Sequence, residues 1–318
     1  MTIESLKYHI KPNEFEKLPV DWEEVFGRKA PLFVEIGFGN GEFLIYLAKE
    51  YPNVNIVGFE LSLTSFVKAQ KKLYDEGIEN VRLVMTDGRF GLRELFTDNS
   101  VKKVYVNFPC PWSKKGHEDR RVTAGDFVET LASVLEMGGE FELATDDERY
   151  ASEVHELLSK SDFFGVEPIH INPDRKVKTR YERKWIEDGR TIHIIRAKKV
   201  KNVSVKRLTW EESAVHVKIE SLNEERIPSL KGKVYKGKND RVFVVKEVFK
   251  DFDGEKYYMK IISSDKGFDQ HYNLILEKKR NFWVLKIDST CHPYRTPTVK
   301  WSLYKIKEEL SNQFARFK

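Results

Sequence analysis

The stretch PLFVEIGFGNGEFLIYLAKE, residues Pro31 to Glu50, decides the fold class of this chain. It begins with a short apolar run, passes through a turn that contains three glycines, and ends with the apolar spacing of a helix. A buried strand, a glycine-rich turn and a helix in this order predict the first unit of a parallel α/β sheet. The glycines let the chain turn tightly and let a ligand approach the backbone at the helix N-terminus.

The same alternation continues to about residue 197. Further strands are predicted at residues 53–60, 81–87, 101–108 and 139–146, with two closing strands at 163–170 and 190–199. Helices are predicted between them at residues 63–77, 88–96, 123–138 and 147–162. This order is typical of a mostly parallel sheet that is covered on both faces.

Three divisions of the chain are expected. Residues 1–30 form a polar N-terminal extension anchored by Trp22, and residues 31–199 form the α/β domain. Residues 200–318 contain five consecutive strand-like runs and a terminal helix, which predicts a C-terminal α+β domain. The five runs lie at residues 232–237, 241–250, 256–264, 272–279 and 282–290, and the helix at residues 298–317.

Charge is distributed unevenly between the two main parts. Residues 1–197 hold 28 Lys and Arg against 34 Asp and Glu, whereas residues 198–318 hold 27 against 16, a net charge of +11. A basic domain joined to an acidic one indicates either a polyanionic partner or a solvated lysine-rich surface. The only two cysteines, Cys110 and Cys291, exclude a disulfide framework. With no secretory signal and no apolar run near the length of a membrane helix, the expected location is the cytoplasm, away from membranes.

Three carboxylates follow three successive predicted strands. Glu35 precedes the glycine turn, Glu60 ends the second strand, and Asp87 ends the third. In open α/β sheets ligands bind at the carboxyl ends of the strands, so this pattern predicts a site for a nucleoside-type cofactor. Because an acidic residue beside the loop would repel a pyrophosphate, it favours a cofactor with a cationic amino group. The loop, with Gly37, Gly39 and Gly41, is similar to the S-adenosylmethionine loop of Rossmann-like methyltransferases.

A second motif, VNFPCPWSKKGHEDRRV, occupies residues 106–122. It resembles the Pro-Asp-Pro-Trp-x-Lys-x-x-His-x-x-Arg-Arg signature of the bacterial tRNA (guanine-N7)-methyltransferase family (TrmB). The matching residues are Pro109, Pro111, Trp112, Lys114, His117, Arg120 and Arg121. The segment ATDDERYA with Asp146, and TRYERKW from Thr179 to Trp185, are similar to two further segments of that family. The resemblance covers residues 30–197, so the chain looks like a long form with a C-terminal extension.

The resemblance implies a class I S-adenosylmethionine-dependent methyltransferase fold. It also implies methyl transfer to N7 of a guanosine in the tRNA variable loop, with tRNA as the partner and no obligatory protein partner. The cofactor residues implied are Glu35, Gly37, Gly39, Gly41, Glu60, Asp87, Asn107 and Cys110. The substrate residues implied are Lys114, Asp146, Thr179, Arg180, Tyr181 and Glu182, and the RNA backbone is expected at Lys115, Arg120 and Arg121.

Cys110 departs from the family pattern, because it stands where the family has an aspartate assigned to catalysis. Three readings remain open: catalysis that is slower, catalysis in which Asp146 or Glu182 supplies the carboxylate, or an RNA-binding paralogue without activity. A methyltransferase acting on another RNA or a small substrate is the further alternative. Asp146 itself could instead be a helix N-terminal acid. His117 has no second ligand at metal-binding spacing, so no metal is expected.

The C-terminal domain has two candidate roles. Its basic charge and its aromatic residues are consistent with a grip on tRNA. The competing interpretation is that it stabilises the catalytic domain.

Overall fold

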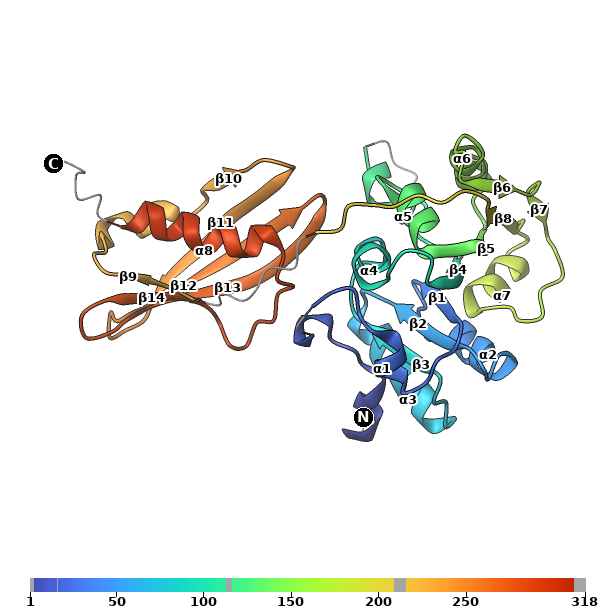
Figure 1. The fold of residues 1–318 in the computed structure, drawn as a ribbon, viewed down its shortest axis with the longest axis horizontal. Helices are drawn as coiled ribbons and strands as arrows, with labels where there is room; N and C mark the ends of the chain where they lie inside the picture. Colours follow the sequence, from blue (N-terminus) through green and yellow to red (C-terminus); the bar gives the residue numbers. More distant parts are fainter. Residues whose placement is uncertain (1–2, 16, 113–115, 209–215, 312–318) are drawn as a thin grey trace. The chain divides into compact units, whose positions relative to one another are not determined.

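The computed structural model describes residues 3–15, 17–112, 116–208 and 216–311. The chain divides into two compact units, Met1–Arg207 and Leu208–Lys318 (Figure 1). Within the described ranges, no helix combines the length and the apolarity that crossing a lipid bilayer requires.

The first unit is built on an eight-stranded sheet. Its central path runs in the order β3-β2-β1-β4-β5-β8-β6, and β7 pairs with β8 off this path. The strands from β3 to β5 are parallel, whereas β8 is antiparallel to β5 and to β6. The predicted α/β sheet of the Rossmann-like class I methyltransferase type is therefore confirmed. The strands are β1 (Leu32–Ile36), β2 (Asn55–Phe59), β3 (Val81–Val84), β4 (Val101–Asn107), β5 (Leu135–Thr145), β6 (Phe164–Val166), β7 (His170–Ile171) and β8 (His193–Lys199).

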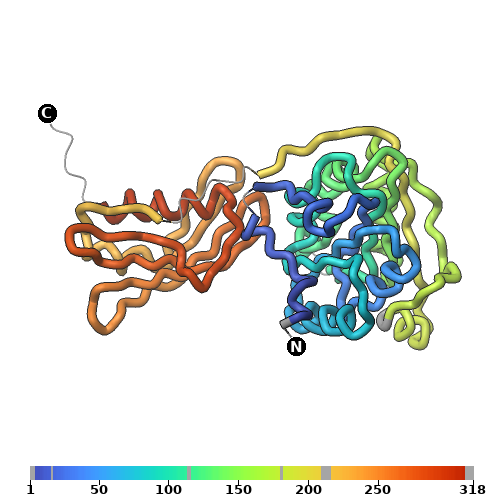
Figure 2. Tube along the Cα trace, turned by 60° about the horizontal axis from the view of Figure 1, so that its bottom comes forward, coloured from blue at the N-terminus to red at the C-terminus, as the bar shows by residue number. Residues whose placement is uncertain are grey.

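Helices cover both faces of this sheet (Figures 1 and 2). Side chains alternate along β1: Phe33 packs in a core shared with α2 and α3, while Val34 packs in a core shared with α4, α5 and α6. Because both faces are buried, β1 is apolar at nearly every position, and the polar side chain of Glu35 is the exception. The helices are α1 (Trp22–Phe26), α2 (Glu42–Glu50), α3 (Leu63–Asp75), α4 (Gly88–Leu95), α5 (Phe127–Val134), α6 (Glu148–Ser159) and α7 (Arg180–Glu187).

Strand order reverses between β1 and β4, and the glycine loop follows β1 at this point. Gly37, Gly39 and Gly41 all have positive φ angles of 53–78°, which other residues rarely adopt. A Cβ on Gly41 would lie 2.9 Å from the Cβ of Ala69, so the start of α2 packs directly against α3. A Cβ on Gly37 or Gly39 would meet nothing within 4 Å, which leaves open space beside the carboxyl end of β1.

The N-terminal extension packs on the first unit. Trp22 is buried, stacks on Phe96 with ring centroids 5.2 Å apart, and donates a hydrogen bond to the carbonyl oxygen of Leu95 at 3.0 Å. The buried hydroxyl of Tyr8 donates to the carbonyl oxygens of Leu73 and Ile78. These contacts explain how an irregular segment is held without a core of its own.

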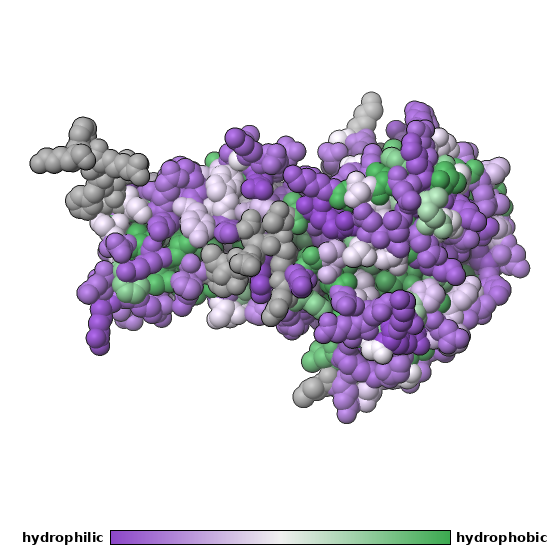
Figure 3. Space-filling view, in the orientation of Figure 1, coloured by the Kyte–Doolittle hydropathy of each residue, from purple (hydrophilic) through white to green (hydrophobic). Residues whose placement is uncertain are grey.

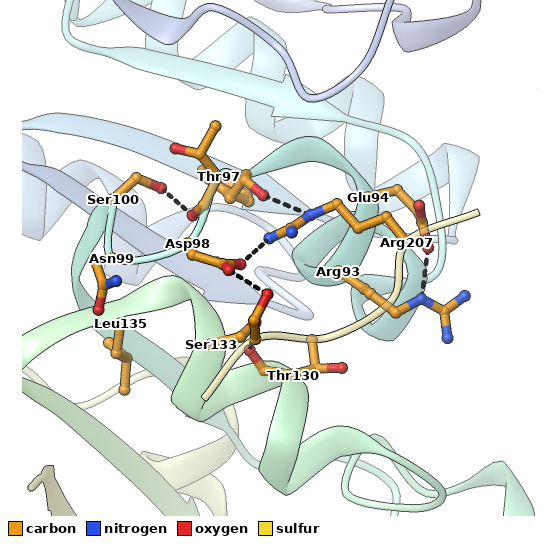
Figure 4. Close-up of polar contacts among 12 residues, drawn as sticks. Arg93, Glu94, Thr97, Asp98, Asn99, Ser100, Thr130, Ser133, Leu135 and Arg207 are labelled. Atoms are coloured by element: carbon orange, nitrogen blue, oxygen red, sulfur yellow. Dashed lines mark hydrogen bonds and ion pairs between the residues drawn. The ribbon is translucent and has the colours of Figure 1, made fainter. Parts of the chain in front are cut away.

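The two units divide after Arg207, eight residues beyond the expected boundary at residue 199. Residues 200–207, which we call the strap, are bonded to the first unit: Asp98 accepts from Ser204 Oγ at 2.7 Å and from Arg207 Nη2 at 2.6 Å. Figure 4 shows the Arg207 guanidinium reaching Asp98, and its Nε also donates to the carbonyl oxygen of Phe96. The basic residues of the strap therefore belong to the first unit.

The second unit is a six-stranded antiparallel sheet in the order β10-β11-β12-β13-β14-β9. The helix α8 (Pro297–Leu310) packs on one face of this sheet through Val299, Leu303 and Ile306. The predicted α+β character of this part is confirmed, with β9 as a strand that the sequence did not predict. The strands are β9 (His216–Ile219), β10 (Val234–Lys236), β11 (Arg241–Lys250), β12 (Lys256–Asp265), β13 (Phe268–Lys278) and β14 (Trp283–Ile287).

Candidate functional site

Glu35 lies at the end of β1 with only 1% of its surface exposed. Its Oε1 accepts a hydrogen bond from Asn107 Nδ2 at 3.1 Å, while Oε2 is buried without a hydrogen-bond partner among the described residues. Burial raises the pKa of Glu35 to about 8, although the Asn107 hydrogen bond and the charge of Arg175 lower it. A buried acceptor without a partner beside the open glycine loop is a binding position for a cationic or donor group.

Glu60 follows β2 and faces the same loop. Its Oε2 accepts from the backbone N–H of Gly39 at 2.9 Å, and its Oε1 accepts from the N–H groups of Leu61 and Ser62. These three bonds fix the carboxylate at the strand end. Its remaining lone pairs can accept from a ribose hydroxyl.

Asp87 follows β3 and caps the N-terminus of α4. It accepts from the backbone N–H of Arg89 at 2.8 Å and pairs with the Arg89 guanidinium at 2.9 Å. Arg89 also donates to the carbonyl oxygen of Asp119, so it ties the start of α4 to the loop after β4. The sequence did not identify Arg89, because an arginine two residues after a capping aspartate has no distinctive pattern.

The proline motif after β4 has an unusual backbone. Phe108 has φ of 50° and Trp112 has φ of 45°, both in the left-handed region that non-glycine residues rarely occupy. Between them lie Pro109, Cys110 and Pro111, so a rigid turn is flanked by two strained residues. Such strain is concentrated at functional sites, where the surrounding structure holds it.

Cys110 is exposed and is a free thiol. Its side chain therefore does not fill an apolar space in this turn. Trp112 is partly buried and contacts residues of its own loop, with the Arg120 guanidinium 5.1 Å from its ring and His117 5.9 Å away. Its indole thus belongs to the loop rather than to the core clusters of the unit.

The basic residues of this motif differ in their surroundings. Arg120 is exposed. Arg121 is mostly buried: its Nε donates to the carbonyl oxygen of Pro111 at 2.8 Å, and its Nη1 pairs with Glu153 of α6. Arg121 therefore holds the proline turn against α6. Lys114 and Lys115 lie outside the described residues.

Asp146 comes directly after β5, but it does not cap the next helix. Asp147 is the N-cap of α6 and accepts from the N–H of Tyr150 at 2.9 Å. Asp146 instead pairs with Arg190 at 2.5 Å, and Arg190 lies 3.8 Å from the ring of Trp185. The cap of α6 is thus Asp147, and Asp146 directly precedes it in the chain.

The segment Thr179–Glu182 begins α7. Thr179 is the N-cap, and its Oγ1 accepts from the N–H of Glu182 at 3.3 Å. Glu182 is 1% exposed, and burial raises its pKa, while Arg175 acts in the opposite direction. The backbone of Arg180 and Tyr181 lies in the first turn of the helix, and their side chains lie outside the described part of the chain.

Arg175 joins the two ends of the site. Its Nη2 donates to Asn107 Oδ1 at 2.8 Å, and its Nη1 pairs with Glu182 Oε2 at 2.8 Å. Its side chain is only 7% exposed and lies 3.4 Å from Glu142. A continuous chain of hydrogen bonds thus runs from Glu35 through Asn107 and Arg175 to Glu182, which we call the site relay.

Arg175 is the first of six basic residues between positions 175 and 184, a run that from sequence alone is expected to bind RNA. Its buried and paired side chain does not fit that expectation. Nothing in the sequence distinguishes Arg175 from the other five basic residues of that run. The separating signal is three-dimensional: buried Glu182 needs a counter-charge, and Arg175 supplies it at 2.8 Å.

The described residues at this strand edge fit S-adenosylmethionine. The unpartnered Oε2 of Glu35 suits its cationic amino group, Glu60 offers acceptors for ribose hydroxyls, and the open space at Gly37 and Gly39 admits a ligand to the backbone. Among the described residues, no group of three or more His, Cys, Asp or Glu side chains could hold a metal ion.

Comparison with known proteins gives consistent results. A family model described as "Putative methyltransferase" matches residues 29–195. The chain is 53% identical over 310 residues to the tRNA (guanine-N(7)-)-methyltransferase of Thermotoga maritima, which covers 96% of this chain and 98% of that protein. The protein of the same name from Coprothermobacter proteolyticus is 31% identical over 95% of this chain and 93% of its own length. That from Oceanobacillus iheyensis is 31% identical and matches 59% of this chain but 90% of its own length, so it is shorter.

Cofactor binding should release a proton. With a pKa near 8, Glu35 is mostly protonated at pH 7, and a bound cationic amino group favours the carboxylate. We expect close to one proton to be released per S-adenosylmethionine bound at pH 7, and the affinity to rise from pH 6 to 8 by up to about tenfold per unit. Calorimetric titrations in buffers of different ionisation enthalpy measure this release. Glu35→Gln should abolish it, and an unchanged release in that variant would assign the proton to another group.

Removal of Arg175 should destabilise the first unit. Arg175→Ala leaves Glu182 buried without its counter-charge, which costs about 3–5 kcal/mol, whereas Glu142 keeps its ion pair with Arg196. The matched control is Arg183→Ala in the same segment, because Arg183 is 52% exposed and its ion pair with Glu42 contributes about 1 kcal/mol or less. Hydrogen exchange of the β4 and β5 amides reports on this unit alone. Equal protection in the two variants would contradict the assigned role of Arg175.

Proposed function

The chain belongs to the tRNA (guanine-N7)-methyltransferase family, and from that premise we propose that it methylates N7 of a guanosine in the variable loop of tRNA. S-adenosylmethionine is the methyl donor. The observation that carries the proposal is the 53% identity to the Thermotoga maritima protein across 96% of the chain, a span that includes both units.

The chemistry requires positioning more than proton transfer. When bound, S-adenosylmethionine supplies an electrophilic methyl group. Guanine N7 has a lone pair and no proton, so no general base is needed to create the nucleophile. Holding the two reacting atoms in line contributes up to about 7–11 kcal/mol, and a rigid proline turn and a fixed α7 are suited to that task.

The cofactor end of the site is formed by side chains at the ends of β1, β2 and β3. We assign the amino group of the cofactor to Glu35, the ribose hydroxyls to Glu60, and the adenine to the neighbourhood of Asp87. Asn107 orients Glu35 through its amide, and the orientation of that amide is fixed in turn by Arg175.

The substrate end comprises Lys114, Asp146 and the segment Thr179–Glu182. Asp146 is 15% exposed and paired with an arginine that is half exposed, so its carboxylate can exchange that partner for guanine N–H donors. Phosphate contacts are assigned to Lys115 and Arg120. Arg121 contributes by fixing the turn that carries them.

The second unit is proposed as an auxiliary tRNA grip. It holds 22 Lys and Arg against 16 Asp and Glu, a net charge of +6, which favours a polyanionic partner. The Oceanobacillus iheyensis relative is shorter and aligns with only 59% of this chain. This supports a second unit that assists binding and is not required for methyl transfer itself. We propose a cytoplasmic location, where tRNA is present, and no obligatory protein partner.

Site mapping tests the proposed function. The full chain is incubated with methyl-labelled S-adenosylmethionine and an unmodified tRNA transcript, and 7-methylguanosine is located by borohydride and aniline cleavage. Cleavage at the variable-loop guanosine is expected, and a transcript with adenosine at that position is the control. Label only at other positions, or only in other RNA, would contradict the proposal, and bound cofactor without transfer would favour an inactive RNA-binding paralogue.

Restoring the family carboxylate should accelerate methyl transfer. Cys110 is exposed beside the strained turn, so Cys110→Asp should fit without repacking. If the site lacks this stabilising charge, kcat should rise by up to about 100- to 1000-fold, whereas Cys110→Ser should change it little. Single-turnover rates at saturating cofactor measure the step. An unchanged rate in Cys110→Asp together with a large loss in Asp146→Asn would show that Asp146 supplies the carboxylate.

A further inference from the structure

The sheet of the second unit has one face under α8 and one face exposed to solvent. The inward side chains, such as Phe243, Met259 and Leu274, are completely buried and pack in the core shared with α8. The alternate side chains on β12 and β13 are exposed or half-buried. Among the described residues of this unit, we call this second set of side chains the open face.

A continuous row of side chains crosses five strands of the open face. The register places Phe249 opposite Tyr258, Tyr258 opposite Ile275, Ile275 opposite Lys286, and Lys286 opposite His216. Phe249 is 48% exposed and Tyr258 is 37% exposed, although aromatic side chains of this size are usually buried. The neighbouring Lys260 lies 5.5 Å from the Phe249 ring, so the row combines aromatic faces with cations.

A groove lies at the β14–β9 end of the same row. Its volume is about 550 Å³, enough for a nucleobase, and Lys218 lies 4.6 Å from the ring of Phe282 at its wall. Its lining is half apolar and half basic: His216, Lys218, Phe282, Val284, Lys286 and Ile287. The side of the molecule drawn in Figure 3 is mostly hydrophilic, with smaller hydrophobic areas between the hydrophilic residues.

This combination selects one class of occupant. Exposed aromatic rings on a sheet face stack on unpaired bases, and lysines beside them bind the intervening phosphates. A lipid surface would require a more continuous apolar face, and a second copy of the chain would bring together units that each carry a net charge of +6. Surface ion pairs such as Lys286 with Glu277 are weak enough to be exchanged for phosphate.

We propose that the open face binds an unpaired segment of the tRNA substrate, with bases stacked on Tyr258 and Phe249 and phosphates bound by Lys260 and the groove lysines. This inference rests on the proposed function only for the identity of the RNA. It assigns tRNA binding to the open face of the second unit, and it predicts that the face covered by α8 does not bind tRNA.

Paired variants of the full chain test this assignment. Tyr258→Ala/Lys260→Ala removes one aromatic ring and one cation from the open face. Tyr304→Ala/Lys307→Ala removes the same pair of residue types from α8, where Tyr304 is 47% exposed. Filter binding of an unmodified tRNA transcript, without cofactor and over a salt series, gives Kd and its salt dependence. We expect a Kd increase of about tenfold or more for the open-face variant, a salt slope smaller by about 0.7, and less than a twofold change for the α8 variant.

Further measurements separate the outcomes. An open-face variant that binds tRNA as the unchanged chain does, or an α8 variant that weakens binding equally, would overturn the assignment. Loss of self-association in the open-face variant, measured by sedimentation with tRNA binding intact, would identify the face as an interface between copies and also overturn it. The proposed function has its own test: it is contradicted if the unchanged chain places no label on a guanosine N7. The binding measurements do not depend on that result, because they require no methyl transfer.

Discussion

The site depends on one constraint: the carboxylate of Glu35 is buried at the end of a central strand. A buried carboxylate must be hydrogen-bonded, paired or neutral, and each outcome has consequences for its neighbours. Asn107 supplies one hydrogen bond, and Arg175 orients Asn107 while it pairs with buried Glu182. The first turn of α7 is therefore connected to this buried side chain through Arg175 and Asn107.

Such an arrangement links the end of β1 to the first turn of α7. A ligand that pairs with Glu35 changes the charge at one end of the relay, and the other end is the first turn of α7. Arg175 pairs with Glu142 of β5 and with Glu182 of α7. The first turn of α7, which Thr179 caps, is therefore tied to the sheet. The strained backbone at Phe108 and Trp112 lies next to this relay in the chain, directly after Asn107.

The sequence was sufficient for the fold class and for the placement of three carboxylates at one edge of the sheet, because strand ends and glycine turns follow from local patterns. Glu35 lies at the end of β1, and Glu60 and Asp87 follow β2 and β3, as expected. Local patterns misplaced elements where tertiary pairing decides them: a helix was expected to residue 138, but α5 ends at Val134 because Leu135 pairs with Val101 in the sheet. They also could not distinguish Arg175 from its basic neighbours, or Asp146 from Asp147, because burial and partner choice are set by residues distant in the chain.

The strap has a consequence for how two modest affinities combine. Because Asp98 holds Arg207 on the first unit and β9 begins at His216, only eight residues separate the two anchored points of the chain. When one unit binds a ligand, a short tether of this kind holds the other unit near that ligand, at an effective concentration of about 1 mM or more. If tRNA binds to one unit, as proposed above, a weak contact from the second becomes an intramolecular event, and avidity multiplies the residence time without a tight site on either unit.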